Sequence, residues 1–320
     1  MTPVTVFGAG AFGTALAISL ARDKHEVTLV ARNAEHAAQM TRDRQNRARL
    51  PAQAFPPQLS PVAGCDDPAP VCLIAVPAQS LSDFVSRHRD ALGGRAIVAC
   101  CKGVDLKTGL GATALITRAC PDARAAILSG PGFAADIAAG LPTALTIAAR
   151  DEALARVLQS ALSTTNLRLY RSSDVVGVEL GGALKNIIAI AAGVAIGAGL
   201  GESARAALIT RGYAEIKRYA LHFGARASTL SGLSGFGDLV LTCTSARSRN
   251  YALGLDLGGG RKTDESLTTE GVATAISVSN LAKTSEIEMP VTDVVAALLD
   301  GRITVEHATR ALFTRPLKEE

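Results

Sequence analysis

The first half of the chain alternates short, almost wholly apolar runs with longer segments of helical periodicity. The apolar runs are rich in Val, Ile, Leu and Ala and occupy residues 4–7, 26–30, 71–76, 96–100, 125–129 and 143–148. Strands that are apolar on both faces and separated by helices are typical of a parallel sheet that helices cover on both sides. The pattern therefore predicts an α/β fold with a doubly wound parallel sheet.

The second half of the chain has a different pattern, because the strand signals stop near Tyr170. Helical periodicity follows and predicts helices at residues 174–196, 204–223, 253–257, 272–284 and 291–299. A length of 320 residues fits two domains. We expect an α/β domain over residues 1–172 and an all-α domain over residues 173–320.

A basic segment lies between the second and third apolar runs. Residues 33–49 are predicted to be helical, and the prolines at 51, 56, 57 and 61 then mark a loop. The helical segment carries Arg42, Arg44, Arg47 and Arg49. We interpret these arginines as a solvated helical face, with a phosphate or nucleic-acid site as the less favoured alternative.

Composition narrows the range of partners. The net charge of +4 suits an anionic small molecule, while 4 % aromatic residues and no Trp offer little for stacking nucleic-acid bases. The six cysteines have neither CxxC spacing nor a histidine at ligand spacing, so we expect buried thiols in a reducing compartment and no metal site. No charged leader precedes the first apolar run, and we expect a cytoplasmic protein.

One segment, residues 175–200, is apolar enough to be mistaken for a membrane span. It contains Glu179, Lys185 and Asn186, and a charged side chain at the centre of a membrane helix costs about 2.5–3.5 kcal/mol on insertion scales. We therefore expect no membrane span here, and interpret the segment as the buried central helix of a soluble protein.

The first apolar run leads directly into Gly8-Ala9-Gly10-Ala11-Phe12-Gly13, and a helix-like run follows. A strand, this glycine spacing and a helix form the fingerprint of a dinucleotide-binding βαβ unit. Gly8 permits the tight turn, Gly10 lets a pyrophosphate approach the backbone, and Gly13 lets the helix pack against the strand. The N–H groups at the start of the helix then attract the phosphates. We expect a Rossmann domain with a nucleotide site here, rather than an ordinary glycine turn.

The end of the second apolar run bears on the choice of cofactor. NAD-specific units place an acidic residue there to bind the ribose 2′-hydroxyl, but this chain reads Val30-Ala31-Arg32-Asn33. A guanidinium at Arg32 can instead bind a 2′-phosphate. The sequence therefore favours NADP(H), with NAD(H) possible; the alternative is that Arg32 is only a solvated residue after the strand.

A lysine inside an apolar helix is costly unless it is paired or functional, and Lys185 lies in such a segment. Burial lowers the pKa of a lysine, which suits a proton donor or acceptor near neutral pH. An ion pair with Glu179 or with another acid is the structural alternative, and composition alone does not decide between the two.

Two polar groups follow in the second half. Asp238 comes directly after Gly235-Phe236-Gly237, which suggests a tight loop that aims a carboxylate. Ser248-Arg249-Asn250 places hydroxyl, guanidinium and amide donors side by side, as a phosphate site requires. Taken alone, these three residues favour the alternative of a helix N-cap with a surface arginine.

Together these segments resemble the bacterial NAD(P)-dependent sn-glycerol-3-phosphate dehydrogenases over nearly the whole chain. The matching segments are residues 8–17, 102–103, 129–134, 180–186, 207–212, 235–245, 248–250, 270–271 and 288–290. The resemblance implies a Rossmann domain followed by an all-α domain like that of 6-phosphogluconate dehydrogenase. It also implies a cytosolic homodimer that reduces dihydroxyacetone phosphate to sn-glycerol 3-phosphate, a precursor of phospholipids.

The resemblance also implies roles for individual residues. Lys185 is expected to act as general acid/base, with Asp238 beside it and Lys102 near cofactor and substrate. The expected cofactor contacts are Gly8, Gly10, Ala11, Phe12, Gly13, Arg32, Lys102, Ala134, Arg249 and Glu270. The expected substrate contacts are Lys102, Gly130, Gly132, Lys185, Asp238, Ser248, Arg249 and Asn250.

The chain departs from the family pattern at three positions. Gly132 stands where a Ser or Thr is usual, so a hydroxyl that would touch the substrate is missing. Asp136 replaces a Glu, and Ser203 replaces an Asn. Two alternative functions stay open: another two-domain dehydrogenase of the 3-hydroxyacid or 6-phosphogluconate type, and a catalytically silent NADP(H)-binding sensor.

Overall fold

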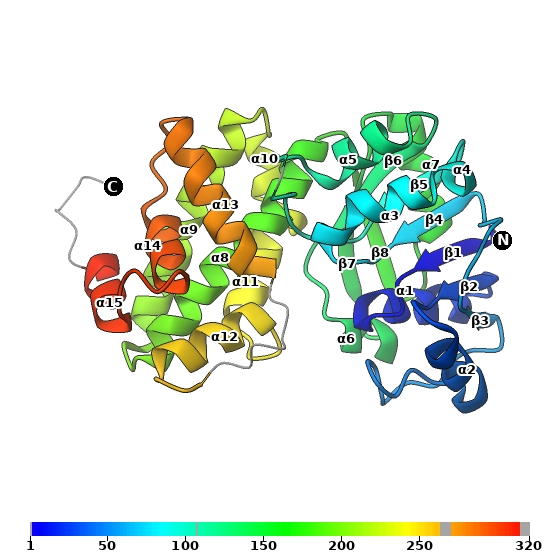
Figure 1. The fold of residues 1–320 in the computed structure, drawn as a ribbon, viewed down its shortest axis with the longest axis horizontal. Helices are drawn as coiled ribbons and strands as arrows, with labels where there is room; N and C mark the ends of the chain where they lie inside the picture. The colour runs from blue at the N-terminus through cyan, green and yellow to red at the C-terminus, as the bar shows by residue number, and fades with distance from the viewer. Residues whose placement is uncertain (1, 107, 263–269, 314–320) are drawn as a thin grey trace. The chain divides into compact units, whose positions relative to one another are not determined.

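The computed structural model describes residues 2–106, 108–262 and 270–313. The chain divides into two compact units (Figure 1). Unit 1 comprises Met1–Lys102 and Leu110–Glu179, and unit 2 comprises Gly103–Gly109 and Leu180–Glu320. The chain therefore passes from unit 1 to unit 2 inside helix α8 (Val175–Gly197), a few residues beyond the expected boundary at residues 172 and 173.

Unit 1 is built on one eight-stranded sheet with the strand order β3-β2-β1-β4-β5-β6-β7-β8. The strands are β1 (Val4–Phe7), β2 (Val27–Val30), β3 (Leu59–Val62), β4 (Val71–Ile74), β5 (Ala96–Ala99), β6 (Arg124–Ser129), β7 (Thr143–Ala148) and β8 (Leu167–Ser172). Helices cover both faces of this sheet, so β1, β4 and β5 are buried along their whole length. This confirms the doubly wound α/β fold and explains why these strands are continuously apolar.

The two faces of the sheet pack against different helices (Figure 1). One face packs against α1 (Ala11–Arg22), α2 (Ala34–Asp43), α6 (Ala134–Ala139) and α7 (Glu152–Leu162). The other face packs against η1 (Ala78–Ser80), α3 (Leu81–Arg87), α4 (Arg89–Leu92), α5 (Ala112–Ala119) and the first turn of α8. Each helix contributes an apolar stripe to one of these two cores.

The expectation of a wholly parallel sheet was wrong at one pair, because β6 and β7 run antiparallel. The connection between them contains only the short helix α6, which packs against α1 instead of running back along the sheet. The chain therefore returns to the sheet at the end of the strands where β6 finished, so β7 runs in the opposite direction.

The sequence pattern also missed both edge strands. β3 lies in the proline-marked segment interpreted as a loop and contains Pro61, which an edge strand tolerates because one of its sides needs no N–H donor. β8 alternates buried and exposed residues at the other edge of the sheet.

The basic helix is shorter than the predicted range 33–49, because α2 ends at Asp43. Arg44 follows in the left-handed conformation with φ 49°, and its guanidinium donates hydrogen bonds to the carbonyl oxygens of Pro56 and Leu59. Arg44 is therefore a structural tie, and its assignment to a solvated helical face was wrong. Arg42, Arg47 and Arg49 are exposed, as expected.

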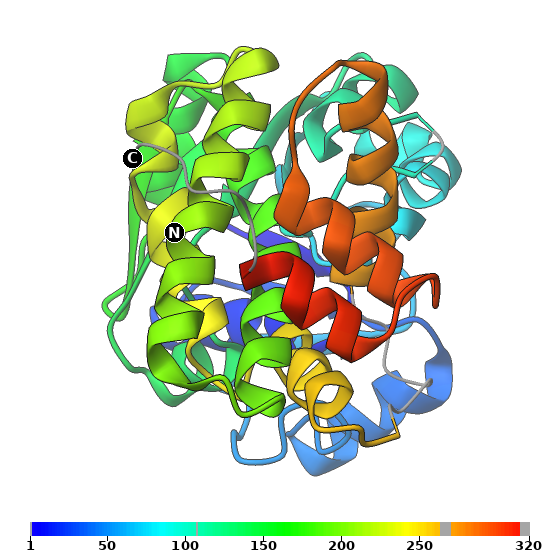
Figure 2. The same ribbon diagram turned by 90° about the vertical axis from the view of Figure 1, so that its left-hand side faces the viewer.

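In the described residues of unit 2 every regular element is helical, which confirms the all-α second domain. The elements that follow α8 are α9 (Gly201–His222), α10 (Ala227–Leu230), a π-helical turn η2 (Leu233–Gly237), α11 (Asp238–Cys243), α12 (Arg249–Gly258), α13 (Glu270–Thr284), α14 (Pro290–Leu299) and α15 (Val305–Phe313). Helices α13, α14 and α15 pack in succession (Figure 2, orange to red).

Helix α8 is the one described helix long and apolar enough to cross a membrane by length and composition, but 89 % of its most apolar window is buried inside the protein. Its interpretation as a buried core helix is confirmed. Gly193 and Gly197 of α8 meet Gly254 and Gly258 of α12 so closely that a Cβ atom at any of the four would clash with the facing backbone. The two helices run in the same direction, which brings the start of α12 beside the middle of α8.

Candidate active site

The glycine-rich turn lies at the carboxyl end of β1. Gly8 has φ +106°, and a Cβ atom there would lie 2.6 Å from the Ala75 carbonyl oxygen, while one on Gly13 would clash with the Gly8 carbonyl oxygen. Gly10 differs from both, because a Cβ atom there would meet nothing within 4 Å. Gly8 and Gly13 are therefore required by the fold, whereas Gly10 faces open space that a ligand can enter.

Helix α1 begins at Ala11 with Gly10 as its N-cap, and Gly10 offers no side chain to the N–H groups of Phe12 and Gly13. Those N–H groups point from the positive end of a 12-residue helix. The turn and the helix start thus have the shape and polarity that the pyrophosphate of a dinucleotide needs.

Arg32 follows β2 after Ala31 and is exposed. The next residue, Asn33, is the N-cap of α2 and accepts a hydrogen bond of 2.9 Å from the backbone N–H of His36. Arg32 therefore sits beside a second helix N-terminus, an arrangement that suits an anionic group such as a 2′-phosphate.

Lys102 and Gly130 lie together at the same edge of the sheet, after β5 and β6. The Lys102 ammonium donates a 3.0 Å hydrogen bond to the Gly130 carbonyl oxygen. Ala134 begins α6 just beyond them. Because β1, β4, β5 and β6 are parallel, their carboxyl ends bring Gly8, Lys102 and Gly130 to one edge, where doubly wound sheets bind ligands.

Gly132 lies in a crowded position. A Cβ atom there would lie 3.2 Å from side-chain atoms of Ile137, Thr143 and Leu145. That separation is tighter than most real Cβ contacts, so a larger residue needs these neighbours to shift. These three side chains therefore leave little room at Gly132 for the Ser or Thr side chain that is usual in the family.

Lys185 forms the most unusual group in unit 2. Its side chain is 6 % exposed and its ammonium lies 3.1 Å from Oδ1 of Asp238, whose side chain is 2 % exposed. The ammonium also donates a 2.5 Å hydrogen bond to the Thr242 hydroxyl, which lies 3.3 Å from the same carboxylate. A buried, paired ammonium held by two acceptors is a group that can hold and release a proton at a defined point.

The structure decides the pairing that the sequence left open. Glu179 accepts a 2.7 Å hydrogen bond from the backbone N–H of Thr113 at the start of α5, and burial raises its pKa. Lys185 pairs with Asp238 instead. Thr242 was not predicted as a site residue, although its spacing of four residues from Asp238 on α11 was a usable signal.

Asp238 reaches Lys185 because α8 and the π-helical turn approach closely. A Cβ atom on Gly181 would lie 2.9 Å from the Ser234 carbonyl oxygen, and Gly181 is one helical turn before Lys185. Gly235 in the turn is similarly close to the Leu230 carbonyl. Single π-helical turns are frequent at functional sites.

The three residues 248–250 divide between two tasks. The Ser248 hydroxyl accepts a hydrogen bond from the Tyr251 N–H and caps α12, which is the structural alternative raised from sequence. Arg249 is exposed on the first turn of α12. Asn250 accepts a 3.1 Å hydrogen bond from the N–H of Gly271, and so places Arg249 near the start of α13, where Glu270 lies.

Cys243 follows Thr242 at the end of α11. Burial raises the pKa of its thiol to about 12, against a smaller opposing effect of the Lys185 charge. The thiol is therefore neutral near pH 7, which argues against a cysteine nucleophile at this position.

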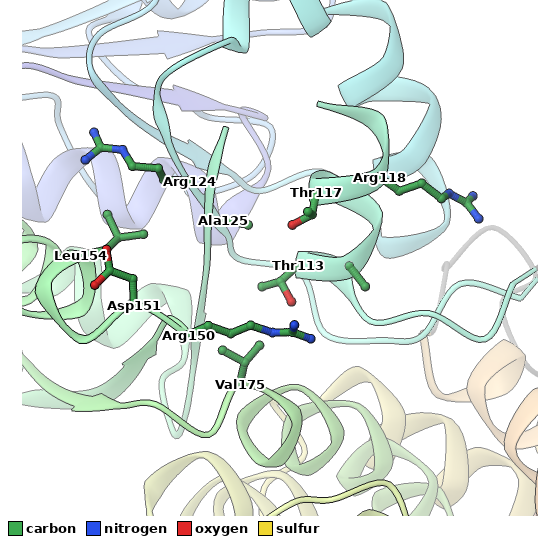
Figure 3. A pocket seen from close by; sticks show the side chains of 10 residues that line it. Thr113, Thr117, Arg118, Arg124, Ala125, Arg150, Asp151, Leu154 and Val175 are labelled. Atoms are coloured by element: carbon green, nitrogen blue, oxygen red, sulfur yellow. The ribbon is translucent and has the colours of Figure 1, made fainter. Parts of the chain in front are cut away.

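A cavity of about 480 Å³ lies in unit 1 away from these residues (Figure 3). It is lined by α5 residues, by Arg124 at the start of β6, and by Arg150 and Asp151 after β7. Figure 3 shows the Arg118 and Arg124 side chains extending in opposite directions, so their charges do not converge on one point. None of the expected site residues lines this cavity.

Comparisons with known proteins agree with this geometry. Residues 3–155 match the family model described as NAD-dependent glycerol-3-phosphate dehydrogenase N-terminus, and residues 174–310 match its C-terminus. The glycerol-3-phosphate dehydrogenase (NAD(P)+) of Ruegeria sp. is 54 % identical over 99 % of both chains. That of Cereibacter sphaeroides is 56 % identical over 99 % of this chain and 100 % of its own length.

Solved structures give the same result. A glycerol-3-phosphate dehydrogenase from Coxiella burnetii superposes with a TM-score of 0.92 at 35 % identity, covering 98 % of this chain and 99 % of that one. A ketopantoate reductase from Ralstonia eutropha, at a TM-score of 0.61 and 16 % identity, shares the fold alone. With both family models matched in order along a chain that carries the glycine-rich turn and the buried Lys185, the chain belongs to the NAD-dependent glycerol-3-phosphate dehydrogenase family.

Proposed function

We propose that this enzyme catalyses the reversible NAD(P)H-dependent reduction of dihydroxyacetone phosphate to sn-glycerol 3-phosphate. The observation that carries the proposal is the buried Lys185–Asp238 pair with its Thr242 contact, in a chain that also has a dinucleotide-binding turn. When bound, the nicotinamide cofactor supplies or accepts the hydride. The open space at Gly10 and the uncapped start of α1 fit its pyrophosphate.

Lys185 is the proposed proton donor to the substrate oxygen that becomes the alcohol. Negative charge builds on that oxygen as the carbonyl is reduced, and a nearby ammonium stabilises it and then transfers a proton. Asp238 pairs with the buried ammonium, and Thr242 accepts a hydrogen bond from it, so both hold its position. Lys102, held by the Gly130 carbonyl, adds a second positive charge for cofactor and substrate.

Arg249 and Asn250 are the proposed ligands of the substrate phosphate, together with the first turn of α12. Ser248 contributes by capping that helix and so setting the direction of its N-terminus. Holding the phosphate at one end of the substrate fixes which carbon receives the hydride, and such positioning supplies several kcal/mol of rate enhancement. Gly132 has no hydroxyl to offer, so either a water molecule or a backbone N–H is proposed to take its place, or the substrate binds more weakly.

Arg32 is the proposed determinant for NADPH over NADH. It is exposed beside the start of α2, where the 2′-phosphate of NADPH can reach both a guanidinium and a helix N-terminus. Arg32→Asp is expected to shift the ratio of kcat/KM values from NADPH toward NADH. An unchanged ratio would remove the basis of this assignment.

The deciding experiment follows the loss of NADPH absorbance after dihydroxyacetone phosphate is added to the purified enzyme, with NADH in a parallel reaction. Lys185→Met is expected to lower kcat by a factor of about 10² to 10⁴ while NADPH still binds. Arg249→Ala is expected to raise KM for the phosphate substrate. Binding of NADPH without turnover would favour the silent sensor, and turnover of a 3-hydroxyacid in its place would favour the other dehydrogenase class.

The enzyme is further proposed to act in the cytoplasm as a homodimer, where its product enters phospholipid synthesis. Support for this comes from the resemblance of the whole chain to the bacterial enzymes. Light scattering after size-exclusion chromatography measures the assembly directly, and a mass of one chain would contradict the dimer.

A further inference from the structure

Asn46 is a buried polar side chain of unit 1 that has no part in the proposed proton transfer. Asn46 lies in the segment after α2, and its side chain is fully buried. Its amide nitrogen donates hydrogen bonds to the Ala9 carbonyl oxygen at 3.0 Å and to the Thr14 hydroxyl at 2.9 Å. Its amide oxygen lies 3.1 Å from Nε2 of His36. Both ends of the amide are therefore engaged with the two segments expected to bind cofactor phosphates.

The directions of these bonds follow from the chemistry of the groups. A backbone carbonyl only accepts, so the amide NH₂ of Asn46 must face Ala9, and its oxygen must face His36. Nε2 of His36 is then the ring nitrogen that carries hydrogen, and it donates a hydrogen bond to that oxygen. All polar atoms of the buried amide are satisfied in this arrangement, and no other orientation of the amide satisfies both contacts.

The bond to Ala9 has a consequence for the neighbouring peptide. The Ala9 carbonyl and the Gly10 N–H belong to one planar trans peptide unit, in which the C=O and N–H bonds point in opposite directions. Because Asn46 holds the Ala9 carbonyl, the Gly10 N–H points away from the Asn46 amide. The second bond, to Thr14, ties the first turn of α1 to the same point.

Asn46 is itself held in place. Its own carbonyl accepts hydrogen bonds from the N–H groups of Arg49 and Leu50, and Leu50 is buried in the core of unit 1. His36 lies in the first turn of α2, whose N-cap is the residue next to Arg32. Asn46 thus joins the turn after β1 to the helix start after β2 through one rigid amide.

We propose that Asn46 is a positioning residue of the dinucleotide site: it aims the Gly10 N–H at the cofactor pyrophosphate and, through His36, keeps the Arg32 segment at a set distance from it. The inference rests on the proposed cofactor site, but it does not depend on which substrate is reduced. Its effect is on cofactor affinity, since Asn46 touches no group that exchanges protons or hydride.

The test is a fluorescence titration of the purified full-length chain with NADPH and with NADH, which needs no turnover. Asn46→Ala removes the amide and is expected to raise both dissociation constants at least about tenfold, the factor that corresponds to one buried hydrogen bond. Asn46→Asp keeps the shape and the acceptor for His36 but cannot donate to Ala9 when ionised, so it is expected to bind as poorly. His36→Ala is expected to weaken NADPH more than NADH.

The matched control is Asn166→Ala. The Asn166 amide also ties down α1, accepting from Ser19 near its other end and donating to the Ile137 carbonyl. It is expected to lower the melting temperature as Asn46→Ala does, yet leave the dissociation constant of NADPH within about twofold of the wild-type value.

Wild-type affinity in either Asn46 variant, or equal loss of affinity in Asn166→Ala, would overturn the proposal. If the wild-type enzyme binds NADPH but does not reduce dihydroxyacetone phosphate, the proposed function fails and this inference is still tested. The melting temperatures are measured on the same samples. They show whether a variant binds NADPH weakly because it is less stable or because the Gly10 N–H is no longer held in position.

Discussion

Lys185 and Asp238 form a buried ion pair in unit 2. The losses of unfolding free energy in the variants Lys185→Met and Asp238→Asn, added together, are expected to exceed the loss in the double variant. Lys185→Met leaves a carboxylate at Asp238 with its side chain only 2 % exposed, and Asp238→Asn leaves an ammonium with its side chain 6 % exposed. Removing one partner of a buried ion pair typically costs about 3–5 kcal/mol of stability. The double variant has neither of these two charges, so its free energy of unfolding is expected to lie well above the value that adding the two single losses predicts.

The size of the coupling follows from the separation of the two groups. Unit charges 3.1 Å apart attract with a gross energy of about 5 kcal/mol at an effective dielectric constant of about 20. Desolvation of both ions offsets much of that attraction, so we expect a measured coupling energy of about 2–3 kcal/mol. Arg310 and Glu306 provide the control, because they lie 3.0 Å apart but are 62 % and 80 % exposed. Their coupling is expected to be about 0.3–0.5 kcal/mol.

The assay is urea unfolding followed by circular dichroism for the wild type, the single variants and the double variant of each pair. Turnover is measured on the same samples and is expected to fall in both single variants, because the ammonium is either missing or has lost the carboxylate that holds it. Losses that add to within about 0.5 kcal/mol at the buried pair would refute the reasoning. Normal turnover in Asp238→Asn would show that the ammonium needs no counter-ion.

Three further predictions concern unit 1. Gly10→Ala is expected to keep the melting temperature but weaken NADPH binding, because its Cβ would enter open space, whereas Gly13→Ala is expected to lower the melting temperature because its Cβ would clash with the Gly8 carbonyl; the opposite ranking would contradict the assignment. Burial raises the folded-state pKa of Glu179, so the folded protein binds this proton more tightly than the unfolded chain, and the free energy of unfolding falls as pH rises above the unfolded value of about 4.3. Glu179→Gln is expected to remove this decline, measured as the difference between the pH profiles of unfolding; parallel profiles would contradict it. Cys65, the one half-buried thiol among the described cysteines, is expected to be the first to react with a thiol reagent in the native protein, and the buried thiols only after unfolding; mass spectrometry of the labelled sites would reveal any earlier reaction.

Short sequence patterns predicted much of this fold. A glycine spacing reports backbone geometry that only glycine allows, so the turn from residue 8 to residue 13 and its helix were predictable. Continuous apolar runs report burial on both faces, and they located the central strands. The burial of Lys185 was foreseeable too, because a lysine in an apolar helix stands out wherever the helix packs.

The edge strands of the sheet, the direction of β7 and long-range hydrogen-bond partners were not predictable from such patterns. The pattern missed β3 because Pro61 is a loop signal everywhere except at an unpaired edge, and whether a strand is an edge depends on the whole sheet. The reversal of β7 depended on where α6 packs, which no periodicity records. The role of Asn46 was not predictable from the basic segment around it, because its amide hydrogen bonds to Ala9 and Thr14 reach residues more than 30 positions away.

The sequence by itself determined that a dinucleotide-binding turn would form and that a lysine would be buried in the helical half, since both follow from sterics and burial within a few neighbouring residues. Only the tertiary structure decided that Lys185 pairs with Asp238 and Thr242, the latter 57 positions away, and that Glu179 on the same helix binds the Thr113 N–H instead. The physical reason is that a buried charge must find a counter-charge or hydrogen-bond partners, but packing alone chooses which of the available groups comes within reach.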